Sequence, residues 1–259
     1  MRRQLRLLAT LIALLLAFLF ASHPFVNYKA VRVKYVIDGD TIILANNQKV
    51  RYIGVDTPET MRKTETGFVH DPKPWGEEAK EFNRRMVEGK VVRLEFDMVK
   101  KDNYGRLLAY CFVGDKFVNG ELLKNGLAML YTYVPNIKYV DILVRAQEEA
   151  RESGINLWQP ERVIPVSKVN SYLGELVIVE GKVLKVKKTN SAIYLNFGKD
   201  SRTDFSVVIF QDNFRLFNEQ KINLDNYYQG KTVRVSGLIK EYRGPQIIVR
   251  HPSQIEIVD

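Results

Sequence analysis

Short runs of β-branched and aromatic residues, each ended by a turn signal, recur along most of the chain and limit its fold more than any other feature. In the first half they extend from Tyr28 to Met98 and are interrupted by turn pairs such as Asp38-Gly39 and Asn46-Asn47. Runs of this kind are typical of β-strands in a partly buried sheet. We therefore expect a curled sheet in the first half of this 259-residue chain.

Helical spacing interrupts the strand pattern at three places. In the first of them, Ala79, Phe82 and Met86 recur on one helical face. Gly126 and Gly154 end the other two, because glycine readily adopts the left-handed conformation that closes a helix. The expected helices cover 76–89, 118–125 and 139–153.

A segment with two prolines, 159–165, ends this pattern, and we place a domain boundary there. Beyond it, five period-two strands follow, with one helix before the fourth. This order predicts a small Greek-key barrel of the OB type. The expected strands cover 177–186, 193–197, 205–209, 232–239 and 246–249, the expected helix covers 213–219, and the two expected domains cover 28–160 and 166–259.

The first 22 residues differ from the rest of the chain. Arginines precede an apolar run over residues 7–21, which is the order of a positive n-region and an apolar h-region. The run is short for a membrane span, and bulky residues precede the only candidate cleavage residue, Ala21. We expect export, with residues 1–22 either removed as a signal peptide or kept as a membrane anchor. The protein would then be secreted or held on the outer side of the cytoplasmic membrane.

Cysteine content and charge narrow the function classes only in part. The single cysteine, Cys111, excludes an intrachain disulfide and a cysteine-based zinc cluster, and its apolar surroundings predict a core residue. The formal net charge of +9 is shared among the N-terminal segment and both domains. Charge alone therefore does not decide whether nucleic acid is a partner.

Three short motifs contain the residue types that phosphodiester hydrolysis requires. They are Val36 to Thr41, Arg51 to Thr60 and Asp102 to Arg106. The carboxylates of Asp40 and Asp56, with the carbonyl of Thr57, form an oxygen-only set that suits a hard cation such as Ca²⁺.

The same motifs contain a candidate base and two candidate phosphate ligands. Glu59 can orient or deprotonate a water molecule, because it follows the proposed metal ligands directly. Arg51 and Arg106 each offer a bidentate fork to phosphate oxygens. Asp38 is expected to serve its turn, and we leave it out of the ligand set.

In order and internal spacing, these motifs resemble the signature of the staphylococcal nuclease (thermonuclease) family. The resemblance spans about residues 30–160 and includes Trp75 to Ala79, Gly126 to Ala128 and Asn156 to Trp158. It implies an OB-type five-stranded barrel with about three helices, so the whole chain is expected to be mainly β with helices. It also implies cleavage of DNA and RNA that leaves 3′-phosphates.

The resemblance also implies a role for each site residue. It implies calcium binding by Asp40, Asp56 and the carbonyl of Thr57, general-base catalysis by Glu59, and transition-state stabilisation by Arg51 and Arg106. Barrels of this family also act as non-catalytic nucleic-acid-binding scaffolds, but the presence of all five charged residues favours catalysis. A monomer is expected by default.

Three tyrosines are candidate substrate contacts. Tyr104 lies beside Arg106 and offers a stacking face, although ordinary packing explains it as well. Tyr131 and Tyr133 resemble the substrate-contacting pair of the family, but their distance from Gly126 is one residue shorter than the usual pattern. The stretch from 60 to 74 is longer than in the family prototype, and we expect it to be a mobile loop whose histidine, His70, has no metal or acid role.

Aromatic and cationic residues alternate in the second domain. This composition fits a groove for single-stranded nucleic acid, and it fits equally the core and solvated face of any small barrel. The residues are Tyr194, Phe197, Phe205 and Tyr242 with Lys185, Lys187, Lys188, Lys199 and Arg243.

Overall fold

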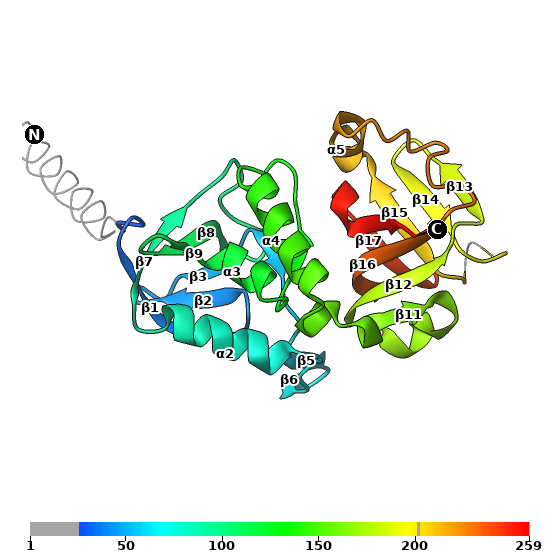
Figure 1. Ribbon diagram of the computed structural model, residues 1–259. Helices are drawn as coiled ribbons and strands as arrows, with labels where there is room; N and C mark the ends of the chain where they lie inside the picture. The colour runs from blue at the N-terminus through cyan, green and yellow to red at the C-terminus, as the bar shows by residue number, and fades with distance from the viewer. Residues whose placement is uncertain (1–25, 201–202, 259) are drawn as a thin grey trace, which may run out of the picture.

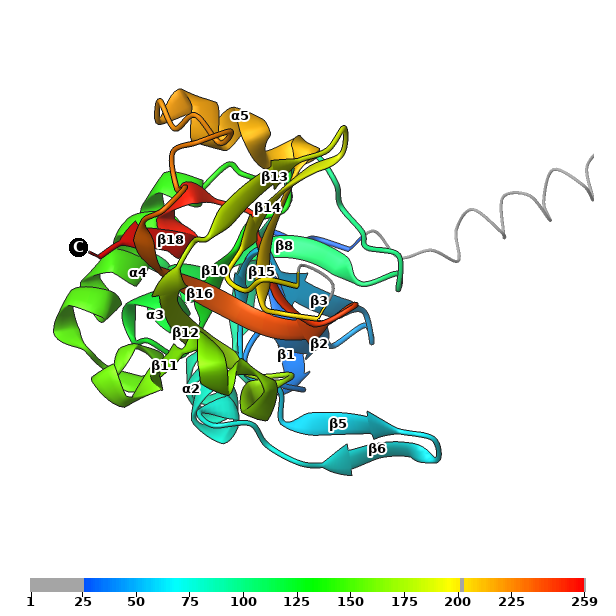
Figure 2. The same cartoon turned by 90° about the vertical axis from the view of Figure 1, so that its right-hand side faces the viewer.

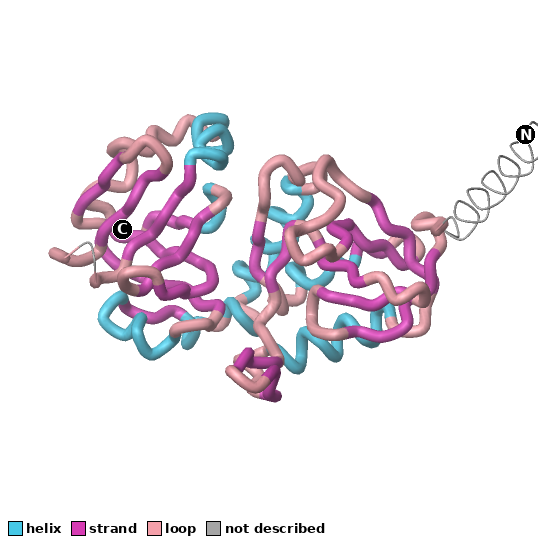
Figure 3. Tube along the Cα trace, turned by 180° about the vertical axis from the view of Figure 1, so that it is seen from behind, coloured by secondary structure: helices cyan, strands magenta, loops and turns pink. Residues whose placement is uncertain are grey.

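The computed structural model describes residues 26–200 and 203–258, so the predicted N-terminal segment 1–22 lies outside the described residues. Two bodies of secondary structure lie side by side (Figure 1). We call the part from β1 (Val31–Val36) to η1 (Asn156–Trp158) the first domain, and the part from β11 (Val163–Pro165) to β18 (Ile255–Ile257) the second domain. Strands dominate both (Figure 3). The described part of the chain contains no helix long and apolar enough to cross a membrane.

The strands of the first domain close into a barrel. Their order is β3-β2-β1-β7-β8-β9, and a parallel pairing of β3 with β8 joins the two sides of the sheet. Closure leaves β1, β2, β3, β7 and β8 each with a neighbour on both sides, and β9 extends the sheet beside β8. The predicted fold class, mainly β with helices and a five-stranded barrel, is confirmed for this domain. The strands are β1 (Val31–Val36), β2 (Thr41–Leu44), β3 (Lys49–Tyr52), β7 (Val91–Glu95), β8 (Leu107–Val113) and β9 (Lys116–Phe117).

Three helices pack against the barrel where the glycine-bounded patterns predict them. They are α2 (Gly76–Val87), α3 (Val118–Lys124) and α4 (Val140–Ser153). On α2, Ala79 is fully buried, while Phe82 and Met86 pack at the edge of the core. After α3, Gly126 has φ of 62°, and a Cβ there would lie 2.6 Å from the carbonyl oxygen of Ile155. Glycine ends this helix because both the left-handed conformation and the close backbone approach require it.

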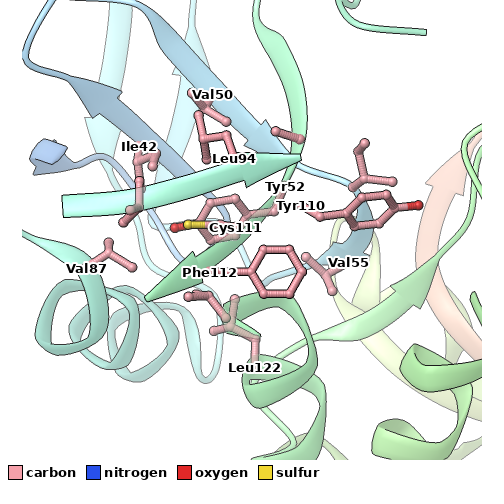
Figure 4. Packing of buried hydrophobic residues seen from close by; sticks show 14 of the residues in the cluster. Ile42, Val50, Tyr52, Val55, Val87, Leu94, Tyr110, Cys111, Phe112 and Leu122 are labelled. Carbon is pink, nitrogen blue, oxygen red and sulfur yellow. The ribbon is translucent and has the colours of Figure 1, made fainter. Parts of the chain in front are cut away.

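The core of the first domain lies between the barrel and these helices (Figure 4). Cys111 is completely buried there, as predicted, and burial raises the pKa of its thiol to about 12. Tyr52 is also buried, and its hydroxyl donates to Oδ1 of Asn83 over 3.0 Å. A buried polar group is tolerated when it finds such a partner.

The segment between β4 (Gly54–Asp56) and α2, for which the sequence predicted a mobile loop, contains two strands. Strands β5 (Met61–Thr64) and β6 (Gly67–His70) pair antiparallel and form a hairpin that projects from the first domain (Figure 2). His70 belongs to this hairpin, and its Nε2 lies 2.7 Å from Oε1 of Glu77 on α2. Nearly every residue of the hairpin is exposed. The sequence therefore contains no alternation of buried and exposed positions that would identify the two strands.

The second domain is an additional β domain. Its strands follow the order β11-β12-β16-β17-β15-β14-β13, with β18 beside β16. The consecutive strands β12 and β13 lie at or near opposite ends of this order, so the sheet curls around its core. The strand predicted over 177–186 is in fact two strands, β12 and β13, whereas the other four predicted strands and the predicted helix are present. The elements are β11 (Val163–Pro165), β12 (Leu176–Lys182), β13 (Lys185–Lys188), β14 (Ala192–Asn196), β15 (Ser206–Phe210), α5 (Phe214–Glu219), β16 (Thr232–Glu241), β17 (Pro245–Val249) and β18 (Ile255–Ile257).

Short 3-10 helices connect the larger elements. They are η1 (Asn156–Trp158), η2 (Pro160–Arg162), η3 (Val166–Tyr172), η4 (Gln211–Asn213) and η5 (Pro252–Gln254). Phe197 and Phe205, candidates for a binding groove in the sequence, lie instead in the core of the second domain with ring centroids 5.0 Å apart. Their side chains point inward because each occupies a buried position at the end of a strand.

A third hydrophobic cluster joins the two domains. Met129, Leu157 and Trp158 of the first domain pack with Leu176 and Ile178 of the second, and all five are less than 10% exposed. Burial of apolar surface on this scale holds domains together, because each fully buried side chain contributes about 1.5–3 kcal/mol. The second domain is therefore packed firmly against the first.

Candidate active site

One guanidinium group organises the acidic residues of the first domain. Arg51 lies on β3 directly opposite Thr41, the residue after Asp40. It forms ion pairs with Asp40 and Asp56, and its Nη2 lies 2.6 Å from Oδ1 of Asp56. Asp56 ends β4 (Gly54–Asp56), a short strand beside the barrel. Two carboxylates, one from the turn before β2 and one from the end of β4, thus converge on one cation.

Asp40 also fixes the position of Thr57. Its Oδ2 accepts hydrogen bonds from the backbone N–H and the hydroxyl of Thr57, over 2.9 and 3.0 Å. Asp40 and Thr57 are 1% and 5% exposed, so these bonds are protected from water. A Cβ at Gly39 would lie 2.6 Å from the Thr57 hydroxyl oxygen, which explains why glycine precedes Asp40.

Asp38 serves its turn, because its Oδ1 accepts the backbone N–H of Asp40 over 3.1 Å. Burial raises the pKa of Asp38, and the positive charges of Arg51 and Arg106 act in the opposite direction. Nothing in this arrangement adds Asp38 to the predicted ligand set.

Glu59 follows Pro58 at the rim of the site and is partly open to solvent. Its pKa is raised, first by loss of solvent around the carboxylate and then by the negative charges of Asp38 and Asp56. Arg51 and Arg106 lower the same pKa, so both arginines act electrostatically on Glu59. A carboxylate with a raised pKa is a stronger base than an ordinary one.

Arg106 is held by the motif that contains it. The Oδ1 atom of Asp102 accepts the backbone N–H groups of Tyr104 and Arg106, and its Oδ2 lies 2.6 Å from Nε of Arg106. Gly105, with φ of 78°, makes this turn possible. The Tyr104 ring lies 5.5 Å from the Arg106 guanidinium carbon and is 86% exposed, so it is free to contact a ligand.

Tyr131 and Tyr133 lie on the side of the site that faces the second domain. Strand β10 (Met129–Tyr131) pairs antiparallel with β4, which places Met129 opposite Asp56. Arg250 of the second domain contacts both rings, with its guanidinium carbon 4.7 Å from the Tyr131 centroid and 4.9 Å from that of Tyr133. Sequence reasoning missed Arg250, because no local pattern connects residues 119 positions apart.

The acidic residues fit a hard cation better than a zinc ion. The described residues contain no group of three His, Cys, Asp or Glu side chains arranged to hold a metal ion. Asp40 and Asp56 nevertheless face a shared positive group, and Thr57 lies beside them. All of these donors are oxygen atoms, and hard cations such as Ca²⁺ complete such sets with carbonyl and water ligands.

Comparisons with known proteins bear on the first domain. The family described as "Staphylococcal nuclease homologue" matches residues 49–160. The thermonuclease of Staphylococcus hyicus is 39% identical over 160 residues, which cover 58% of this chain and 92% of that protein. The chain belongs to the staphylococcal nuclease family. The thermonuclease of Staphylococcus intermedius is 43% identical over 130 residues, 49% of this chain and 74% of that protein. Endonuclease YncB of Bacillus subtilis is 42% identical over 127 residues, 47% of this chain and 58% of that protein.

The staphylococcal nuclease match includes Arg51, Asp56, Glu59 and Arg106. The family predicted from the motifs is thus confirmed, and every predicted site residue except Asp40 lies inside the matched segment. The second domain lies outside it. Any effect of Arg250 on Tyr131 and Tyr133 therefore comes from the second domain, outside the segment that matches the family.

Proposed function

We propose that this protein is a calcium-dependent nuclease that hydrolyses phosphodiester bonds of DNA or RNA by attack of water and leaves 3′-phosphates. The observation that carries the proposal is the convergence of Asp40 and Asp56 on Arg51, beside Glu59 and Arg106, within a staphylococcal nuclease domain. The printed names of the relatives, thermonuclease and endonuclease, support the same activity.

The two arginines would bind the scissile phosphate and stabilise the charge that develops on it. Arg51 contacts carboxylates in this structure, and a phosphate can accept the same N–H groups when substrate is present. Among the described residues, the Arg106 side chain forms a hydrogen bond only through Nε, to Asp102, so its two terminal nitrogens would be available to phosphate oxygens. Removing one donor of this kind costs on the order of 100- to 1000-fold in rate.

Glu59 would orient a water molecule and take its proton. Its raised pKa and its position at the rim, accessible to solvent, suit this role. Asp40, Asp56 and the Thr57 carbonyl would hold Ca²⁺, which would supply positive charge next to the phosphate and favour ionisation of the attacking water. Tyr104, Tyr131 and Tyr133 would contact the nucleotides on either side of the scissile bond.

Two further assignments belong to this proposal. We infer that the second domain is an OB-like barrel, which the parallel pairing of β15 with β17 and the curled strand order support. We also infer that the protein is exported, either secreted or anchored outside the cytoplasmic membrane through residues 7–21, and acts there as a monomer. The charge and apolar pattern of the N-terminal segment supports export.

The test is cleavage of single- and double-stranded DNA and RNA by the full chain with Ca²⁺, with a calcium chelator, and with the Glu59→Gln variant. We expect the chelator to abolish cleavage, and Glu59→Gln to lower kcat by about 100- to 10,000-fold because a general base is lost. The matched control is Glu65→Gln, which removes an exposed carboxylate in the turn of the β5–β6 hairpin and should leave kcat unchanged.

Two results would contradict the proposal. Cleavage by Glu59→Gln at the rate of the unmodified protein would show that another group acts as base. Binding of oligonucleotide without cleavage, measured by fluorescence anisotropy with Ca²⁺ present, would favour the scaffold function instead.

A further inference from the structure

The second domain presents one continuous outer face across four of its strands. On β17, Ile247 and Val249 are fully buried, so Gln246 and Ile248 point to the outside. Residues that pair directly on neighbouring strands point to the same face of a sheet, so the strand pairings identify the outer residues of the other three strands. They are Ser206 and Val208 on β15, Asn196 and Tyr194 on β14, and Lys185 and Lys187 on β13. Asn196 and Val208 are only 4% and 2% exposed, so they form the floor of this face.

A groove of about 500 Å³ lies on this face. Tyr194, Phe210 and Tyr242 line it, and Phe210 and Tyr242 are 40% and 68% exposed. Lys187 and Arg243 line it as well, and none of its described lining residues is acidic. Exposed aromatic rings among cations are the features that bind unpaired bases and the phosphates between them.

The cations of the groove are available to a ligand. Within the described residues, Lys187 and Arg243 have no ion-pair partner. The adjacent Lys188, on the opposite face of β13, has its Nζ 2.8 Å from Oδ1 of Asp225. Asp225 therefore pairs with Lys188, outside the groove, whereas Lys187, inside it, has no ion-pair partner among the described residues.

The outer face leads to the active site of the first domain. Arg250 follows β17 and places its guanidinium against Tyr131 and Tyr133, and its Nη2 donates to the Tyr131 hydroxyl over 3.1 Å. Nε of Arg250 is buried and has no hydrogen-bond partner among the described residues. Lys240 of β16 and Asp56 line the same small cavity between the domains. In Figure 1, β16 and β17 lie on the side of the second domain that faces the first.

We propose that this outer face binds a single strand of nucleic acid and directs it into the active site. Bases stack on Tyr194, Phe210 and Tyr242, phosphates contact Lys187 and Arg243, and Arg250 binds the phosphate that enters beside Tyr131 and Tyr133. The ligand is single-stranded because the aromatic faces reach only unpaired bases. The path toward cleavage rests on the proposed nuclease function, whereas binding in the groove does not.

The first experiment measures binding without cleavage. Fluorescence anisotropy, in the presence of a calcium chelator, follows a dye-labelled 20-nucleotide oligothymidylate and a 20-base-pair duplex added to the full chain. The groove variants are Lys187→Ala/Arg243→Ala and Tyr194→Ala/Tyr242→Ala. The controls are Lys188→Ala/Lys231→Ala, which removes the same number of charges, and Tyr227→Ala, which removes one exposed ring; Lys231 and Tyr227 contact each other outside the groove.

We expect each groove variant to weaken binding of the single strand by about tenfold or more, because each lost stacking contact costs about 1–3 kcal/mol. Removal of two phosphate contacts should also lower the slope of log K against log salt by about 1.4. The controls should bind like the unmodified protein, and the duplex should bind more weakly than the single strand. Equal affinities for groove and control variants, or a preference for the duplex, would overturn the proposal.

The second experiment tests the path to the active site with Arg250→Met, which keeps an apolar chain of similar reach but removes the charge. We expect the ratio of kcat/KM for the 20-nucleotide strand to that for a thymidine dinucleotide to fall about tenfold. An unchanged ratio would overturn the role of Arg250. If the unmodified chain binds the oligothymidylate through the groove but cleaves nothing, the nuclease proposal fails and the groove remains.

Discussion

At the residue scale, a few charged side chains hold the site together, because each of them contacts more than one partner. Arg51 forms ion pairs with two carboxylates and offsets part of their mutual repulsion, and Asp40 in turn holds the Thr57 backbone. Each of these residues has a structural role in addition to its proposed chemical one. Substitutions of Arg51 or Asp40 are therefore expected to lower stability as well as activity. Substitution of Glu59, at the rim, is expected to lower activity alone.

A buried histidine should make the stability of the protein depend on pH. His251 is 5% exposed, and burial lowers its pKa to about 4, against a small opposing effect of Asp141. Between about pH 4 and 6.5 the unfolded chain binds a proton at this position that the native chain does not. His251 therefore contributes stability above pH 6.5 that is lost as the pH falls toward 4.

The corresponding variant is His251→Asn, which removes the titrating group and keeps an acceptor for the Ser253 N–H. Between pH 7 and 4.5 it should lose less free energy of unfolding than the unmodified protein, by on the order of 2 kcal/mol. Urea unfolding followed by circular dichroism at the two pH values measures this difference. A pH dependence in His251→Asn equal to that of the unmodified protein would refute the assignment.

At the element scale, the first residue of α2 supports the loop that contains Glu59. A Cβ at Gly76 would lie 2.8 Å from the carbonyl oxygen of Glu59 and 3.2 Å from that of Pro58. Both atoms belong to the backbone, so the loop itself would have to move. Helix α2 thus positions the proposed base through backbone contact.

We expect Gly76→Ala to displace Glu59 and reduce kcat, because a shift of about 1 Å at a catalytic group can cost on the order of 100-fold. Stability should fall by about 1–3 kcal/mol, as for other overpacked positions. Steady-state cleavage assays and urea unfolding measure the two effects. Glu78→Ala, at an exposed position in the same turn of α2, should change neither. Full activity of Gly76→Ala would show that the helix does not position Glu59.

The helices and most strands could be predicted because their signals are local. The glycines at the ends of α2, α3 and α4 and the apolar spacing within them lie inside the elements that they define. The β5–β6 hairpin could not be predicted, because its exposed residues show no alternation. Its two strands are paired with each other and cover no core.

At the scale of the whole molecule, the two domains share a hydrophobic cluster and should unfold together. Both tryptophans of the chain, Trp75 and Trp158, belong to this cluster or pack against it. Their fluorescence therefore reports on the interface, while circular dichroism reports on all elements. In the unmodified protein the two urea transitions should coincide.

The Ile178→Ala variant should separate these transitions. It leaves a cavity between the domains and costs about 2–5 kcal/mol, so the fluorescence transition should occur at lower urea than the circular dichroism transition. Lys182→Ala, an exposed substitution on the same strand, should leave both transitions coincident. Coincident transitions in Ile178→Ala would show that packing in this cluster is not what couples the domains.

The sequence by itself determined the family, most secondary structure and the types of residue at the site. These depend on short motifs and on spacing within single elements, where neighbours in sequence are also neighbours in space. The tertiary structure decided which charges meet. It alone joins β3 to β8, places Arg51 between the carboxylates of Asp40 in a turn and Asp56 at the end of a strand, and brings Arg250 to Tyr131 across the domain boundary. Such contacts depend on how barrels close and how domains pack, and no local pattern of residues encodes either.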